Sequence, residues 1–215
     1  MEQAKGSLLK IFLGMPRDVE WRGKTLKTAL WKSEPAEQKA WVRKEGIDGD
    51  RPGNPEVHGG AWKAVYSYAS EHYCDWRKEF PNTEFAWGVF GENFLTEGLD
   101  EEAICVGDRI QVGERVILEA IEPRQPCFKL EARFAMQGQD GMMKNFLEAG
   151  RWGIYYRVLV EGAVAVGDPA YLVRRHPARI ALKRVPGLRR AMKAGKFETP
   201  ADAATISRLA VDGLF

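Results

Sequence analysis

The stretch of residues 106–127, VGDRIQVGERVILEAIEPRQPC, decides the fold class of this chain. Its first part contains two runs rich in branched aliphatic residues, 109–112 and 116–121, with Gly113 between them. Such runs favour strands, and a glycine between two strands supplies the backbone conformation of a tight turn. The stretch therefore predicts a β-hairpin.

The end of the same stretch predicts a stiff bend after the hairpin. Pro123 and Pro126 fix their φ angles and have no backbone N–H, so this part is a poor central strand. Cys127 follows directly. We therefore expect Cys127 on a rigid turn, which is a common position for binding groups.

Further runs of β-forming residues indicate a body rich in strands. Residues 8–14 and 25–31 are two of them, with the turn-prone pair Arg22-Gly23 between them. Residues 154–160 and 163–166 predict another hairpin, because only two turn-forming residues separate them.

Two helices are expected among these strands. Apolar residues from Val65 to Phe80 recur at helical spacing, and Pro81 ends the run. A second helix is expected between Asp140, whose side chain can cap it, and Gly150. Two helices among many strands do not form the alternating βαβ series of a doubly wound sheet. The sequence therefore predicts a mainly β fold with a few helices (α+β), built on a barrel or a strongly bent sheet.

The composition is that of an ordinary globular chain of 215 residues, with 45% hydrophobic and 29% charged residues. This length permits one substantial core. The apolar runs are too short to cross a bilayer, and the first residues lack the basic and apolar regions of a secretory leader. The three cysteines have no paired spacing, which predicts thiols in a reducing compartment and a cytoplasmic location.

The net charge is only +2, but positive charge is concentrated in residues 174–215, which hold ten Lys and Arg against three Asp and Glu. We interpret this segment as a helical appendage, broken at Pro186-Gly187, that rests on an acidic body. The alternative is a surface for nucleic acid or an acidic partner. Scarce aromatic residues in the segment argue against a base-stacking platform. A domain boundary is expected near residue 174.

Polar residues that can carry chemistry gather at three bends shaped by glycine or proline, 57–60, 90–93 and 123–127. Cys127 is the strongest candidate because Arg124 and Lys129 are close to it in sequence, and nearby cations lower the pKa of a thiol. A thiolate is a soft ligand for a polarisable metal. The alternative for Cys127 is a buried structural cysteine, which is the preferred interpretation for Cys74 and Cys105.

His58, Glu92 and Lys32 are further candidates. His58 precedes two glycines, so it can line a cleft and shuttle a proton near neutral pH, or it can be a hydrogen-bonded structural residue. Glu92 beside Asn93 offers an acceptor next to a donor, and its alternative role is to cap a turn. Lys32 follows a strand and can reach an anionic ligand, although a solvated lysine is the more common case.

Taken in order, short motifs along the chain resemble those of MOSC-domain proteins of the YiiM type. They are Trp21-Arg22-Gly23-Lys24, Gly49-Asp50, Val57-His58-Gly59-Gly60, Ala64-Val65-Tyr66, Glu71-His72-Tyr73, Phe90-Gly91-Glu92-Asn93, Val106-Gly107-Asp108, Pro123-Arg124-Gln125-Pro126-Cys127 and Gly150-Arg151. The resemblance covers residues 6–173. The basic C-terminal segment departs from it, because YiiM-type chains often end in a three-helix domain.

This resemblance implies a MOSC-type β-barrel in residues 1–173, with Cys127 facing a cleft and ligating the molybdenum of a molybdenum cofactor in its molybdopterin form. It implies roles for His58 and Glu92 in substrate orientation and proton delivery. The cofactor's phosphate needs cations or backbone N–H groups. The candidates to hold the cofactor beside Cys127 are Lys32, Gly59, Gly60, Asn93 and Arg124.

The resemblance also implies an enzyme that reduces N-hydroxylated compounds, hydroxylaminopurine bases among them. Such an enzyme takes two electrons from a reductase or a small redox protein. No membrane partner is expected, and the oligomeric state is left open. Two other functions also stay open: a sulfur carrier with a persulfide on Cys127, and a non-catalytic binding module whose basic segment contacts nucleic acid.

Overall fold

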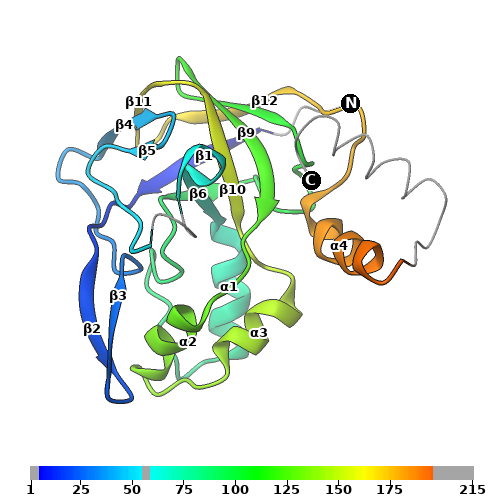
Figure 1. Cartoon of the computed structure of the whole chain (residues 1–215). Coiled ribbons are helices and arrows are strands. Elements are labelled where there is room, and N and C mark those ends of the chain that lie inside the picture. The colour runs from blue at the N-terminus through cyan, green and yellow to red at the C-terminus, as the bar shows by residue number, and fades with distance from the viewer. Residues whose placement is uncertain (1–4, 55–58, 196–215) are drawn as a thin grey trace.

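Seven strands close into a barrel in the computed structural model, which describes residues 5–54 and 59–195 (Figure 1). Around the barrel they follow the order β1 (Lys5–Ile11), β12 (Pro169–Arg174), β8 (Arg109–Val112), β9 (Val116–Pro123), β10 (Ile154–Val160), β6 (Val65–Ala69) and β7 (Phe94–Glu97). Neighbouring strands are antiparallel except β6 and β7, which are parallel, and β7 pairs with β1 to close the ring. The predicted mainly β barrel is confirmed.

Two smaller sheets flank the barrel. One contains β11 (Gly162–Ala165), β4 (Lys39–Arg43) and β5 (Gly46–Ile47), and the other is the hairpin of β2 (Arg17–Trp21) and β3 (Lys24–Thr28). The turn of this hairpin is Arg22-Gly23, whose φ angles of 50° and 71° are the left-handed conformations that a two-residue hairpin turn uses. The turn predicted at this pair is therefore confirmed.

The hairpin predicted from residues 106–127 is also present. Strands β8 and β9 pair from Arg109 opposite Glu119 to Val112 opposite Val116. Gly113 begins the turn with a φ of 61°. The aliphatic side chains of the two strands are buried in the main core, which explains why this stretch is so rich in branched residues.

Two predictions from local pattern are wrong. Strand β11 pairs with β4 in the flanking sheet rather than with β10, because only Glu161 separates β10 from β11 and the chain bends into the second sheet there. Helix α1 (Ser70–Glu79) begins later than the spacing from Val65 suggests, because Val65–Ala69 forms β6. Every residue of β6 is buried, and a fully buried strand cannot be distinguished from a buried helix by its periodicity.

Three helices, α1, α2 (Phe128–Ala135) and α3 (Met142–Ala149), pack below the barrel in Figure 1 around a cluster of aromatic side chains. Tyr68 and Phe90 stack with their centroids 4.4 Å apart, and the indole N–H of Trp76 donates to the Tyr68 hydroxyl at 2.7 Å. The Phe146 ring lies parallel to that of Trp76. No helix in the described ranges has both the length and the apolar character needed to cross a membrane.

The C-terminal segment continues with η2 (Leu182–Arg184) and α4 (Val185–Lys193). The helix break expected at Pro186-Gly187 is wrong, because both residues lie in the first turn of α4. Proline is tolerated there because its missing N–H has no acceptor within the helix to lose. Leu182 and Leu188 are buried in the main core, so this part of the segment packs against the barrel.

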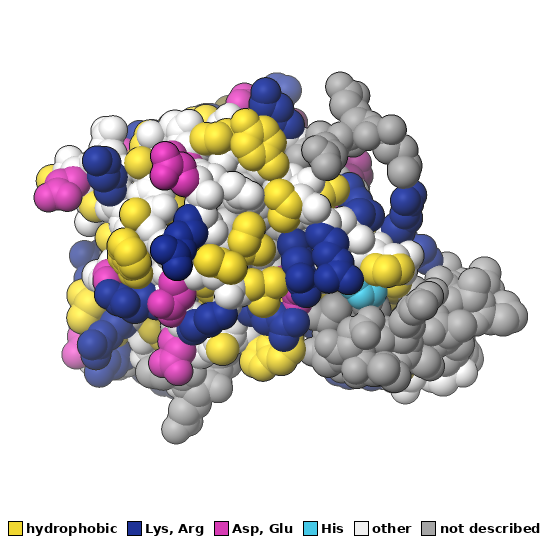
Figure 2. All heavy atoms as spheres, turned by 90° about the horizontal axis from the view of Figure 1, so that it is seen from above, with side chains coloured by type: hydrophobic (Ala, Val, Ile, Leu, Met, Phe, Trp, Pro, Cys, Tyr) yellow, Lys and Arg dark blue, Asp and Glu magenta, His cyan; other side chains and the backbone are white. Residues whose placement is uncertain are grey.

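Cations of this segment pair with carboxylates of the barrel region, as a basic appendage on an acidic body requires. The pairs are Arg175 with Asp108, Lys183 with Glu102 and Arg189 with Glu122. On the face that Figure 2 shows, Lys and Arg side chains are interspersed with acidic and hydrophobic ones. The domain boundary near residue 174 stays a prediction.

The N-terminus of α3 is capped by a carboxylate from α2 rather than by Asp140. Glu131 accepts hydrogen bonds from the backbone N–H groups of Gly141 at 2.6 Å and Met143 at 2.8 Å. Asp140 instead forms an exposed ion pair with Arg22 at 3.4 Å. The predicted Asp140 cap is wrong because the left-handed Gly141, with a φ of 81°, occupies the position before the helix.

We expect Glu131→Ala to lower the free energy of unfolding by about 1 kcal/mol, because two N–H groups at a helix end lose their acceptor. Asp140→Ala is the control, and it should change this free energy by less than about 0.5 kcal/mol because exposed ion pairs contribute little. Urea denaturation followed by circular dichroism measures both. A loss for Asp140→Ala that equals the loss for Glu131→Ala would contradict the assignment of the cap.

Candidate functional site

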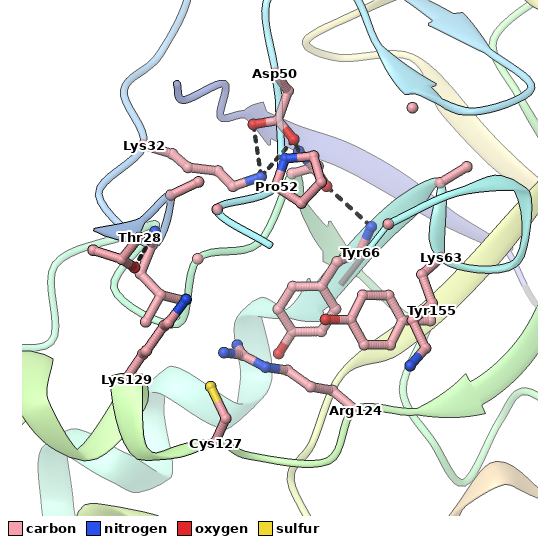
Figure 3. Close-up of a pocket in the computed structure, with 18 of the residues that line it drawn as sticks. Thr28, Lys32, Asp50, Pro52, Lys63, Tyr66, Arg124, Cys127, Lys129 and Tyr155 are labelled. Atoms are coloured by element: carbon pink, nitrogen blue, oxygen red, sulfur yellow. Dashed lines mark hydrogen bonds and ion pairs between the residues drawn. The ribbon is translucent and has the colours of Figure 1, made fainter. Parts of the chain in front are cut away.

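A cavity of about 110 Å³ opens where β6 and β10 meet the loops after β3, β5 and β9. A second hollow of about 410 Å³ adjoins it and shares part of its wall. Segments far apart in the sequence contribute side chains, and Figure 3 shows how these converge. Of the predicted site residues, the cavity brings together Lys32, Gly59, Asn93, Arg124 and Cys127.

Cys127 lines both hollows. It is half-buried and lies immediately before the first residue of α2, after the bend that follows β9. In Figure 3 its sulfur points into the cavity beside the guanidinium of Arg124. The predicted turn at the end of the strand is present, and the sulfur is not sealed in the hydrophobic core. By contrast, Cys105 is buried as expected, whereas Cys74 is exposed on α1, so the expectation of a buried structural cysteine is wrong for Cys74.

Arg124 is a buried cation next to Cys127, with only 4% of its surface exposed. One guanidinium N–H group donates to the carbonyl of Phe90, and the guanidinium carbon lies 4.9 Å from the ring centroid of Tyr66. Burial by itself lowers the pKa of Arg124, but the neighbouring tyrosines and Cys127 raise it, and the net direction is upward. Arg124 therefore keeps its charge, and a fixed positive charge beside a thiol favours the thiolate.

Asp50 holds Lys32 and Asn93 in the cavity wall. The Lys32 ammonium lies 2.8 Å from both carboxylate oxygens, and the Asn93 amide donates to one of them at 2.9 Å. The Lys32 side chain is only 8% exposed, so the expectation of a solvated lysine is wrong. Burial lowers the pKa of Lys32, and the interaction with Asp50 opposes that shift. No role was predicted for Asp50, although an acidic residue after a glycine turn was a usable signal.

Two more lysines border the cavity. Lys63, at the end of η1 (Ala61–Lys63), lies 3.3 Å from Glu122, and Lys129 on α2 donates to a backbone carbonyl of β3 at 2.7 Å. Counting only lining residues in the described ranges, the cavity has four cations against the carboxylates of Glu45 and Asp50. A wall with this excess of positive charge favours an anionic ligand.

Only one residue of the glycine pair that was predicted to approach a phosphate lines the cavity. Gly59 lines the cavity. Gly60 is exposed and does not line it, and its φ of 74° explains why glycine is required at the start of η1. His58 lies outside the described residues, so its role stays a prediction.

Glu92 lies behind the cavity wall rather than on it. The residue is fully buried, and one of its oxygens accepts hydrogen bonds from the Tyr73 hydroxyl and from the backbone N–H of Gly88. Its other oxygen has no hydrogen-bond partner within the part of the chain that the structure describes. Burial raises the pKa of Glu92. The structure places this carboxyl away from the cavity surface. Its role in proton delivery stays a prediction.

Two tyrosines for which no role was predicted form another wall of the cavity. Tyr66 on β6 and Tyr155 on β10 are cross-strand partners, and their ring centroids lie 5.0 Å apart. Along β10 the residues on either side of Tyr155, Ile154 and Tyr156, are buried in the barrel. Tyr155 therefore projects from the opposite face, and the alternation of the strand was the signal that could have identified it.

Residues 54–171 match the family model of the MOSC domain. In sequence, the chain is 37% identical to the Bacillus subtilis protein YflK over 175 residues, which is 81% of this chain and 76% of YflK. It is 37% identical to Escherichia coli YiiM over 132 residues, covering 60% of this chain and 57% of YiiM. A Gibberella moniliformis protein named as a reductase is 39% identical over 132 residues, which make up only 23% of that protein.

Two crystal structures of YiiM proteins resemble this structure. YiiM from Geobacillus stearothermophilus superimposes with a TM-score of 0.71 at 26% identity, covering 95% of this chain and 90% of that chain. YiiM from Escherichia coli gives a TM-score of 0.61 at 21% identity, covering 99% of this chain and 94% of that chain, which supports the fold alone.

We expect Asp50→Asn to lower the free energy of unfolding by about 3 kcal/mol, because it leaves the buried Lys32 without a counter-ion. Asp48→Asn is the control, since Asp48 pairs with Arg43 at the surface, and its effect should not exceed about 1 kcal/mol. Urea denaturation at neutral pH measures both. Adding Lys32→Met to Asp50→Asn should restore part of the lost stability, and an absence of recovery would contradict this account of the pair.

Glu92→Gln tests the buried carboxyl through the pH dependence of stability. Because burial raises the pKa of Glu92, its contribution to stability is fully present below the unfolded-state pKa and is lost as pH rises through the folded-state pKa. The variant cannot ionise, so its stability relative to wild type should increase from about pH 4 towards neutral pH. Urea denaturation at a series of pH values measures the difference, and a constant difference would refute the assignment.

Proposed function

Because the chain belongs to the MOSC domain family, we propose that it binds a molybdenum cofactor through Cys127 and reduces N-hydroxylated compounds such as hydroxylaminopurine bases. The observation that carries the proposal is the half-buried thiol of Cys127, which faces a cavity lined by an excess of cations. The Gibberella moniliformis relative, which is named as a reductase, supports the reaction type. We propose a cytoplasmic location, because a reducing compartment keeps such a thiol available.

The residues of the cavity fit a group that combines a soft metal with a phosphate. A thiolate is a soft ligand, and Arg124 supplies the positive charge that favours this form of Cys127. Lys63 and Lys129 border both hollows and suit an anionic phosphate. Within residues 5–54 and 59–195, no cluster of His, Cys, Asp and Glu could hold a metal ion by itself. Cys127 is therefore the protein ligand that we propose.

When bound, the cofactor supplies the two-electron chemistry that cleaves the N–O bond, with the electrons coming from a reductase or a small redox protein. The chain's own residues bind and orient the reactants. Lys32 and Asn93, held by Asp50, form a fixed polar wall on the inner side of the cavity. We propose that His58 orients the substrate and that His58 and Glu92 deliver protons, as the family resemblance implies.

A second candidate function is a sulfur carrier with a persulfide on Cys127. The observation that favours it is the position of Cys127 in the wall of the larger hollow, where a sulfur atom can be passed to an acceptor. This function needs the same thiol but no metal, so one set of variants separates the two candidates.

We expect Cys127→Ala, made in a host that synthesises the cofactor, to lose bound molybdenum and released-pterin fluorescence. The loss should exceed the roughly 10- to 100-fold effect of removing an outer-shell partner of a metal. Reduction of 6-hydroxylaminopurine with a chemical electron donor should fall in parallel. Cys74→Ser, which changes an exposed thiol on α1, is the matched control and should resemble wild type.

Full metal content and activity in Cys127→Ala would rule out the proposed enzyme. A different result would favour the sulfur carrier: mass spectrometry of the native protein would show an added sulfur atom on Cys127, and no pterin would be released.

A further inference from the structure

Tyr155 lies at the boundary between the two hollows that meet at Cys127. The cavity and the larger hollow share four wall residues, which are Lys63, Cys127, Lys129 and Tyr155. A ligand in either hollow can reach these side chains. Of the four, Tyr155 is the one with an O–H group. This group can donate a hydrogen bond but carries no positive charge that would attract an anion.

The hydroxyl of Tyr155 has no hydrogen-bond partner among the described residues. The buried tyrosines of the barrel and the aromatic cluster differ, because each of their hydroxyls is bonded within the fold. Those tyrosines are Tyr66, Tyr68, Tyr73 and Tyr156. An O–H group at a cavity wall that has no partner in the described protein is available to donate a hydrogen bond to a ligand that enters the cavity.

The ring of Tyr155 is held in place by its neighbours. The ring of Tyr66 packs against it, and the Lys63 ammonium lies 5.7 Å from its centroid. Figure 3 shows the Tyr155 hydroxyl pointing into the cavity on the side of Arg124 and Cys127. The donor is therefore pre-oriented, so a ligand that uses it does not have to order a mobile side chain.

The protonation state of Tyr155 suits a donor. Burial raises the pKa of Tyr155; the positive charge of Arg124 opposes this rise, and the negative charge of a Cys127 thiolate adds to it. The hydroxyl therefore keeps its proton throughout the neutral pH range.

We propose that the Tyr155 hydroxyl donates a hydrogen bond to the N–O oxygen of the substrate and positions it beside Cys127. This inference rests on the proposed function for the identity of the ligand, because the N-hydroxyl oxygen is the acceptor that substrate and amine product do not share. A site that donates a hydrogen bond to that oxygen discriminates against a molecule that lacks it, since the donor is then left unpaired. Tyr155 is thus the residue by which the site distinguishes substrate from product.

The test compares the binding of 6-hydroxylaminopurine and adenine to the protein without cofactor, so that no turnover occurs. We expect wild type to bind the hydroxylamino base about 10-fold more tightly, the ratio expected for one well-placed hydrogen bond. Tyr155→Phe should bind the two bases with nearly equal affinity. Tyr171→Phe, which alters an exposed tyrosine on β12, should keep the wild-type ratio. Isothermal titration calorimetry measures the dissociation constants.

Thermal unfolding separates this effect from a loss of structure. Tyr155→Phe should keep the wild-type Tm, because the hydroxyl it removes makes no bond within the described fold. Tyr66→Phe should lower the Tm, because its hydroxyl donates to the backbone carbonyl of Trp152 at 2.8 Å.

Equal affinities of wild type for the two bases would overturn the inference, as would a preference that survives in Tyr155→Phe or an absence of measurable binding to wild type. A preference that depends on Tyr155 in a protein that cannot reduce the base when loaded with cofactor would overturn only the proposed reaction. Reduction of the base with no effect of Tyr155→Phe on the ratio would overturn only the role of Tyr155.

Discussion

The site depends on the contacts that stabilise the buried guanidinium of Arg124. A charge in the interior must be matched by hydrogen bonds or by aromatic faces, or it destabilises the fold strongly. Arg124 is matched by the carbonyl of Phe90 and by the ring of Tyr66, so it links the end of β9 to β6 and to the segment before β7. The same contacts hold its charge next to Cys127. The contacts of this one buried cation therefore fix the positive charge beside Cys127.

The wall that contains Lys32 and Asp50 also depends on a buried cation and the groups that stabilise it. Lys32 is buried, and Asp50 neutralises it while also accepting hydrogen bonds from Asn93 and from the backbone of Gly14. A carboxylate with this many donors is rigid, because moving it would break several bonds at once. The cavity thus has one wall in which charge is balanced and another, around Arg124, in which positive charge prevails.

Those parts of the fold that follow from local chemistry could be predicted from the sequence. The hairpin around Gly113, the turn at Arg22-Gly23 and the bend before Cys127 depend on residues adjacent in the chain, and each is present. The errors arose where distant parts of the chain decide the outcome. Strand β6 looks helical because its neighbours bury every side chain, and the cap of α3 comes from Glu131 on another helix.

The site residues differ in the same way: local sequence predicts some of them, and contacts between distant segments determine the roles of the others. Cys127 and Arg124 could be predicted because the bend that presents them is encoded in consecutive residues. Sequence signals mark Asp50 and Tyr155, but their roles depend on which strands and loops the barrel brings together. The role of Glu92 in proton delivery stays a prediction, and the structure adds that its carboxylate lies behind the cavity wall. Adjacency to lining residues in the sequence does not show which way a side chain points.

The position of Cys127 directly before α2 has a further consequence. The first N–H groups of a helix have no acceptors within it, and the aligned peptide dipoles place partial positive charge at that end. The sulfur therefore experiences the field of a helix end in addition to that of a guanidinium, and both act on its charged form. An atom that is activated in this way and borders an open hollow is a target for electrophiles and oxidants. A ligand bound in the cavity would also shield this sulfur from them.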